Sequence, residues 1–243
     1  MSSILNQLSD RIYYLPYSSD TDRPNLGYIR GDRSSLMVDA GNSAGHAALF
    51  LQSLKELELP TPQYVAITHW HWDHTFAMHA VPGITIAGRL TNEQLSKVMA
   101  WDWTEEAMQS RLSSGEEIEF CDTHIRLEYP DLDKITVTTA DIVFDQCLVL
   151  DLGGITAQFI HIGGPHSEDS VVVYIPEEKI LFLGDADGGD FYHMQGLYDK
   201  KKLLTFIQFL RDLDFKISIG GHDIPVTKGE LLAYMEEELA TLS

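Results

Sequence analysis

The chain has 243 residues, with 17 basic side chains against 37 acidic ones and a formal net charge of −20 at pH 7. Hydrophobic residues make up 44% of it, which is enough for a substantial core and excludes a disordered chain. The negative field repels polyanions and anionic membrane surfaces, so we expect a small-molecule substrate and neither a nucleic-acid nor a membrane partner.

The N-terminal letters MSSILNQLSD lack the basic start and long apolar run of a secretory signal, and no run of 18 apolar residues occurs anywhere. We therefore expect a cytoplasmic protein. Cys121 and Cys147 are too few for a disulfide framework and are not spaced as a CxxC motif.

Short apolar runs bounded by Gly, Pro, Asp or Asn predict strands in the first part of the chain. They lie at residues 26–30, 36–38, 64–67 and 84–87. Between the second and third runs, leucines and alanine recur at helical spacing and predict a helix over residues 44–59.

A second set of runs predicts more strands. They lie at residues 135–138, 148–150, 155–160, 171–175 and 180–183. An amphipathic helix around Leu203–Leu213, a strand at 216–219 and a last helix from Lys228 follow. Two strand-rich halves that each end in helical material predict two packed sheets with helices outside.

The segment 89–133 interrupts this alternation, and its early part has apolar residues at helical spacing. We predict a partly helical insertion that is either a lid or a segment packed against the body. As a lid, its Trp101, Trp103 and Met108 would offer a flat apolar surface to a neutral or acyl-bearing small molecule.

The densest group of chemically active residues is the run THWHWDH at 68–74, directly after a predicted strand. Neutral imidazole and carboxylate are ligands that Zn²⁺ prefers. If the strand continues, His69 and His71 point the same way, because strand side chains alternate, and both reach one ion. Asp73 and His74, on the turn beyond, then reach a second ion.

Two ions need more ligands than this cluster supplies, and three later strand ends offer them. In each, an apolar strand ends in glycine, which lets the backbone approach closely, and a ligand-type side chain follows. These side chains are His166, Asp185 and His222.

Residues 69–74 resemble the HxHxDH motif of the metallo-β-lactamase fold hydrolases, and the three later side chains match the remaining ligand positions of that superfamily. Asp39 matches its early aspartate, so the resemblance covers nearly the whole chain. It implies an α/β (α+β) fold, a four-layer αββα sandwich, in a single domain over residues 1–243. The metals would lie at one edge of the two sheets.

The resemblance also implies how two divalent ions, most plausibly Zn²⁺ with Fe or Mn as alternatives, would be held. His69, His71 and His166 would bind one ion, Asp73, His74 and His222 the other, and Asp185 would bridge them. A bridging hydroxide would act as the nucleophile, since a bound cation lowers the pKa of water to about 7. Asp73 would also orient it and pass a proton to the leaving group. Asp39 would support the ligands from behind.

The expected reaction is hydrolysis of a small ester-like substrate such as a lactone or thioester. One major β-lactamase class has cysteine where this chain has Asp185, which argues against that class. The excess of acidic over basic residues argues against the nuclease branch. Hydrolysis of β-lactams or phosphodiesters remains an alternative. Tyr192 and His193 fall where lactonase-like members place a tyrosine near the substrate, so both are candidate catalytic residues, as an oxyanion donor or in packing.

Other chemistry occurs on the same fold. One alternative is a mononuclear iron site that oxidises sulfur compounds, and another is di-iron electron transfer. The di-iron branch usually has a carboxylate in place of one motif histidine, whereas His71 is retained here, which favours hydrolysis. A metal-binding scaffold without activity is the non-catalytic alternative.

Overall fold

The computed structural model describes residues 4–242, and its strands form two sheets. The N-terminal sheet follows chain order: β1 (Asn6–Gln7), β2 (Ile12–Leu15), β3 (Leu26–Arg30), β4 (Ser35–Val38), β5 (Tyr64–Ile67), β6 (Ile84–Gly88) and β7 (Ile142–Phe144). Strands β1 to β4 pair antiparallel, and β4 to β7 pair parallel. The parallel strands therefore deliver their C-terminal ends to one edge.

The C-terminal sheet has the order β13 (Val226–Thr227), β12 (Ile217–Gly220), β11 (Ile180–Gly184), β10 (Val171–Ile175), β9 (Thr156–His161), β8 (Cys147–Asp151). Only β11 and β12 pair parallel within it. Both of these strands end at the same edge, where predicted ligands follow them.

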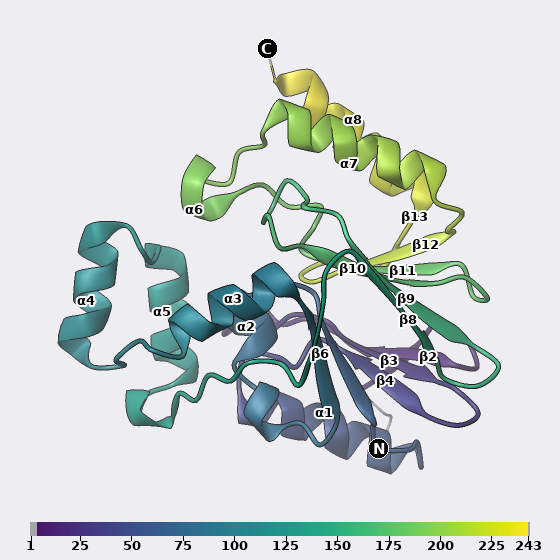
Figure 1. Cartoon of the computed structure of the whole chain (residues 1–243), viewed down its shortest axis with the longest axis horizontal. Helices are drawn as coiled ribbons and strands as arrows, with labels where there is room; N and C mark the ends of the chain where they lie inside the picture. Colours follow the sequence, from purple (N-terminus) through teal and green to yellow (C-terminus); the bar gives the residue numbers. More distant parts are fainter. Residues whose placement is uncertain (1–3, 243) are drawn as a thin grey trace.

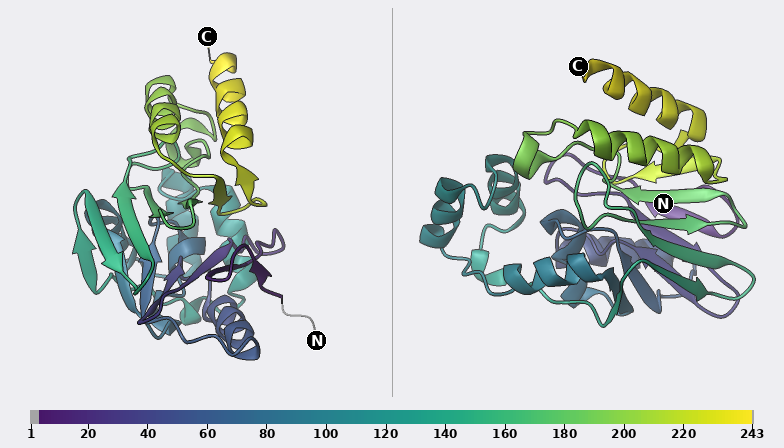
Figure 2. Two further views of the ribbon diagram at one scale, coloured as in Figure 1. Left: turned by 90° about the vertical axis from the view of Figure 1, so that its right-hand side faces the viewer. Right: turned by 45° about the horizontal axis from the view of Figure 1, so that its top comes forward.

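Helices cover the outer faces of the two sheets, which gives the predicted αββα layers (Figure 1). Helix α1 (Ala44–Glu56) lies under the N-terminal sheet, and α7 (Lys200–Asp212) and α8 (Lys228–Thr241) lie over the C-terminal one (Figure 2). Short helical turns complete the body: α2 (Trp72–Thr75), η1 (Met78–Ala80), η2 (Leu132–Lys134) and α6 (Phe191–Met194). No helix within residues 4–242 is long and apolar enough to cross a bilayer.

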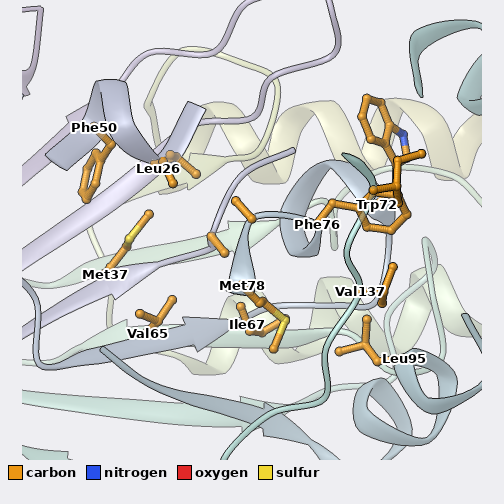
Figure 3. Close-up of a cluster of buried hydrophobic side chains, with 14 of the residues drawn as sticks. Leu26, Met37, Phe50, Val65, Ile67, Trp72, Phe76, Met78, Leu95 and Val137 are labelled. Carbon is orange, nitrogen blue, oxygen red and sulfur yellow. The ribbon is translucent and has the colours of Figure 1, made fainter. Parts of the chain in front are cut away.

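Three layers of apolar side chains hold the sandwich together. Leu36 and Phe159 belong to the layer between the sheets, and Val172 and Phe206 to the layer beneath α7 and α8. The third layer packs α1 and the insertion on the N-terminal sheet; Figure 3 shows Met37, Val65 and Ile67 there with Phe50 of α1. Strands β4, β10 and β11 are buried along their whole length, and this explains their unbroken apolar runs.

The insertion is helical along most of its length, with α3 (Arg89–Val98), α4 (Glu105–Ser114) and α5 (Glu119–Glu128). Helices α4 and α5 project from one side of the body (Figure 1). The end of α5 is tied back to the body, because Arg23 pairs with Glu128 at 2.8 Å and the Tyr129 hydroxyl donates to the Asn42 carbonyl. That the segment moves as a lid stays a prediction.

One predicted strand is wrong. Residues 135–138 are extended but pair with no strand among residues 4–242. Ile135 and Val137 are buried in the layer beneath the N-terminal sheet, so their alternation reflects packing of an irregular segment. The short strands β1, β2, β7 and β13 are not predicted by the sequence, because they have too few residues for a clear period.

Truncating the layer between the sheets tests the fold. Phe159 on β9 is fully buried, and we expect Phe159→Ala to lower the free energy of unfolding by about 3–5 kcal/mol. Val149 on the neighbouring β8 is 63% exposed, so Val149→Ala should change it by less than about 0.5 kcal/mol. Urea denaturation measures both; equal effects would contradict this core.

Candidate metal centre

The THWHWDH run leaves β5 before its first histidine. The strand ends at Ile67, residues 68–71 have no regular structure, and α2 begins at Trp72 with His71 as its N-cap. The prediction that strand alternation aligns His69 and His71 is therefore wrong. Their rings still meet, with centroids 4.5 Å apart, because the loop bends at the sheet edge.

Seven side chains at this edge form two groups of neighbouring ligand atoms. Within each group the atoms lie within 4.8 Å of one another. The groups are His69, His71 and His166, and Asp73, His74, Asp185 and His222.

Asp185 lies between the two groups. Its Oδ2 is 3.8 Å from Nε2 of His166, and its Oδ1 is 3.3 Å from Nε2 of His74. In the second group, Oδ2 of Asp73 lies 2.9 Å from Nε2 of His222. Residues that are far apart in the sequence thus converge in the arrangement that the resemblance implies.

Two glycines make this convergence sterically feasible. Gly184 has φ +55°, and a Cβ there would lie 2.4 Å from Oγ1 of Thr68. A Cβ on Gly221 would lie 2.0 Å from Oδ1 of Asp185. Any larger residue at either position would displace a ligand-bearing loop.

Asp39 supports the cluster from behind, as predicted. It accepts hydrogen bonds from the backbone N–H of Thr68 at 2.8 Å and from the Thr68 hydroxyl. It also accepts from Nδ1 of His74 at 2.8 Å, while Nδ1 of His166 donates to the Gly189 carbonyl. The bonds made by Nδ1 of His74 and Nδ1 of His166 fix the tautomers of these two rings, so that Nε2 of each ring can bind a cation.

The two groups differ in their electrostatics. Burial lowers the pKa of His69 and lowers that of His71 to about 3, so both rings are neutral, which is the form that binds metals. Burial also acts to lower the pKa of His222, but the carboxylates of Asp185 and Asp73 outweigh it and raise that pKa to about 9. Cation binding in the second group would therefore release protons.

Within residues 4–242, buried Nε2 of His69 has no hydrogen-bond partner, and Nε2 of His74 and Oδ1 of Asp185 make no well-aligned hydrogen bond although they lie 3.3 Å apart. Leaving a buried polar atom unpaired costs about 1–3 kcal/mol. Nδ1 of His71 and Nε2 of His166 lie 3.0 Å apart, close to the ~3.3 Å between two nitrogens on one tetrahedral Zn²⁺. The donor set therefore fits divalent cations.

The loop that carries His222 is held by residues from the other end of the chain. Nδ2 of Asn25 donates to the carbonyls of Gly220 and Asp223 at 2.8 and 2.7 Å. Oδ1 of Asp22 lies 3.5 Å from Nδ1 of His222, where a carboxylate orients a metal-binding ring. Neither Asn25 nor Asp22 is predicted by the sequence, because no local motif marks a contact between positions almost 200 apart.

Tyr192 and His193 are neighbours on α6 and differ in their burial and contacts. The Tyr192 ring is 5.1 Å from the His71 ring, and its hydroxyl donates to Glu117 at 2.8 Å. A role as oxyanion donor would require this bond to break, and it stays a prediction. The His193 side chain is 82% exposed and held by Asp190, and it borders a second cavity whose lining also includes His71, His166 and Tyr192.

A cavity of about 460 Å³ opens directly on the ligand cluster. The ligands that border it are His71, Asp73, His166, Asp185 and His222. The insertion reaches the cavity through Ile118, Phe120, Cys121 and His124 at α5.

The tryptophans of the insertion do not line this cavity. Trp101 and Trp103 instead stack on the guanidinium of Arg111, at 4.5 and 4.9 Å, and Trp103 contacts Phe76 of the body. Met108 is buried beside them. The flat surface expected from these three residues therefore serves packing.

Comparisons with known proteins agree with this geometry. The family model described as "Metallo-beta-lactamase superfamily" matches residues 20–222. An uncharacterized protein of Methanocaldococcus jannaschii is 25% identical over 178 residues, which are 72% of this chain; the match spans 36% of that protein.

Solved structures show the same fold. A metallo-beta-lactamase from Pontibacter korlensis has a TM-score of 0.70 and 19% identity, covering 98% of this chain and 99% of its own. A stereoselective inverting sec-alkylsulfatase from Pseudomonas sp. has a TM-score of 0.71 and 15% identity, covering 98% of this chain and 41% of its own. At these identities the likeness is one of fold.

The support from Asp39 predicts a loss of metal affinity in its amide variant. Asp39 has φ 60°, a conformation that asparagine tolerates, so Asp39→Asn changes the hydrogen bonds and not the backbone. One carboxylate oxygen becomes an NH₂ that faces a donor, and we expect zinc affinity to fall about 10- to 100-fold in competition with a chelating dye.

Asp145→Asn is the matched control, since Asp145 pairs only with Arg89 at the surface. Its zinc affinity should equal that of the unaltered protein. Unchanged affinity in Asp39→Asn, with an unfolding curve that shows a folded protein, would contradict this support role.

Proposed function

The chain belongs to the metallo-beta-lactamase superfamily, and we propose that it is a metal-dependent hydrolase acting with a pair of divalent ions on a small ester-like substrate, such as a lactone or thioester. The observation that carries this proposal is the position of Asp185. Its Oδ1 lies 3.3 Å from Nε2 of His74, and its Oδ2 lies 3.5 Å from Nε2 of His222 and 3.8 Å from Nε2 of His166, so this one carboxylate contacts nitrogens of both ligand groups. Such a carboxylate suits two neighbouring cations better than one.

The proposal assigns each ligand residue to one or both ions. His69, His71 and His166 would hold one ion, Asp73, His74 and His222 the other, with Asp185 shared. When bound, two ions supply a nucleophile from water at neutral pH and polarise the scissile carbonyl. Zinc suits these nitrogen and oxygen donors, and iron or manganese are the alternatives.

Asp73 has a further role in this proposal. It borders the cavity as well as the ligand cluster, so its carboxylate can orient the attacking water, accept the proton that the water gives up, and pass that proton to the leaving group. Tyr192, on the wall of the same cavity, is the candidate donor to the developing oxyanion once its hydroxyl leaves Glu117.

The mononuclear iron alternative is less well supported. It would leave Asp73 and His222 without a function, yet these two side chains lie 2.9 Å apart and both border the cavity. Hydrolysis of β-lactams or phosphodiesters uses the same ions, and only a substrate panel separates these reactions from ester cleavage.

Metal content and activity test the proposal together. We expect two ions per chain by elemental analysis, loss of hydrolysis after chelation, and its return with Zn²⁺. Asp185→Asn should lose at least one ion and about 100-fold or more in kcat/KM, because one oxygen no longer binds a cation. Asp214→Asn is the control, because Asp214 forms a surface ion pair with Lys179, and it should keep the metal content and the kcat/KM of the unaltered protein.

The substrate panel contains a lactone, a thioester, a β-lactam and a phosphodiester. Cleavage of the phosphodiester alone would overturn the choice of substrate. A single bound iron together with oxidation of sulfur compounds would overturn the dinuclear mechanism.

A further inference from the structure

Exposed aromatic side chains from four distant segments border the same cavity. They are Tyr17, Phe120, Phe191 and Tyr234, which are 37, 52, 52 and 47% exposed. Single exposed apolar side chains are ordinary on any protein surface. Four of them around one concavity next to a polar centre are typical of a ligand-binding wall.

Neighbouring contacts hold this aromatic wall in place. Phe120, on the first turn of α5, packs on the His124 ring at 4.1 Å, and Nδ1 of His124 donates to the Phe120 carbonyl. Phe191 lies 6.2 Å from the His166 ring, so the wall continues down to the ligand cluster. The Tyr234 hydroxyl is 3.3 Å from that of Tyr198.

The ionisable side chains that line the cavity also bear on which substrates it can bind. Its lining includes no lysine or arginine, whereas Asp22, Asp187 and Asp223 contribute carboxylates beyond the two carboxylate ligands. Bound cations would place positive charge only at the reacting group. A second anionic group on a substrate would find no lysine or arginine in this lining to pair with.

We propose that the aromatic wall binds the apolar acyl chain of a neutral ester, and that the cavity disfavours substrates with an anionic group away from the scissile bond. This proposal rests on the hydrolase function argued above and specifies its substrate class. A volume of about 460 Å³ accommodates an acyl chain of several carbons with its leaving group.

The test compares esters on the zinc-loaded protein. The probes are p-nitrophenyl acetate, butyrate and octanoate, and mono-p-nitrophenyl octanedioate, which adds a terminal carboxylate to the octanoyl chain. We expect kcat/KM to rise about 10-fold or more from acetate to octanoate, because each buried methylene favours binding. It should fall about 10-fold or more from octanoate to octanedioate.

Variants on α5 locate the effect. Phe120→Ala should reduce the ratio of octanoate to acetate activity at least threefold, and Phe120→Lys should raise octanedioate activity relative to octanoate. Leu127→Ala is the matched control, since Leu127 is on the same helix, is 55% exposed and lies outside the cavity. It should leave every ratio unchanged.

Titration calorimetry with acetamide and octanamide separates the two proposals. Tighter binding of octanamide that is lost in Phe120→Ala supports the aromatic wall even if no ester is cleaved, in which case the hydrolase function fails alone. Equal binding of both amides, or equal activity toward octanoate and octanedioate, overturns the wall.

Discussion

Burial of acids and imidazoles at one sheet edge is the constraint on which the rest of the structure depends. Five histidines and two aspartates crowd into the ligand cluster, and several of their polar atoms lack well-aligned hydrogen bonds among the described residues. Such groups are costly to bury unless charge compensates charge. Divalent cations would provide that compensation, and part of the free energy of metal binding would then stabilise the fold.

The topology explains why this edge can assemble the cluster. Parallel strands β4 and β5 bring Asp39 next to the loop that carries His69, and parallel strands β11 and β12 bring Asp185 next to His222. The antiparallel strand β9 adds the loop with His166. His69, Asp185 and His222 lie within two residues of the ends of β5, β11 and β12, so the sheets fix their positions, whereas Asp73 and His74 are held on α2 and His166 on the loop after β9.

The ligand set was readable from the sequence because ligand chemistry is local. A histidine or aspartate directly after an apolar strand is visible in a short window, and most predicted strands were confirmed. The path of the chain between His69 and Asp73 was not readable, since a four-residue strand and a bent loop leave no period. The strand prediction for residues 135–138 was wrong for a related reason. Alternating apolar residues indicate that alternate side chains are buried, and they do not show that the backbone pairs with another strand.

Contacts between distant segments were beyond any sequence pattern. Asn25 reaches the loop of His222 across almost 200 positions, and nothing around it indicates that partner. The aromatic wall likewise draws one residue each from the loop between β2 and β3, α5, α6 and α8. Long-range assembly decides both features, and a single sequence displays only short-range regularities.

Tyr192 connects the insertion to the metal centre. Its ring lies against His71 and Trp70, while its hydroxyl bonds to the buried Glu117 just before α5. Burial raises the pKa of Glu117. A displacement of α5 would therefore change the position of the His71 ring, because the side chain of Tyr192 contacts both.

Charge acts on substrate choice at two distances. At long range the net charge of −20 repels anions in solution, and at short range the cavity lining includes carboxylates but no lysine or arginine. Cations held by the ligand cluster would attract negative charge mainly within a Debye length, roughly 8–10 Å, because salt screens them beyond that. Under the proposed function, a neutral molecule that develops negative charge as it reacts would meet neither obstacle, and the field of the cations would stabilise its transition state more than its ground state.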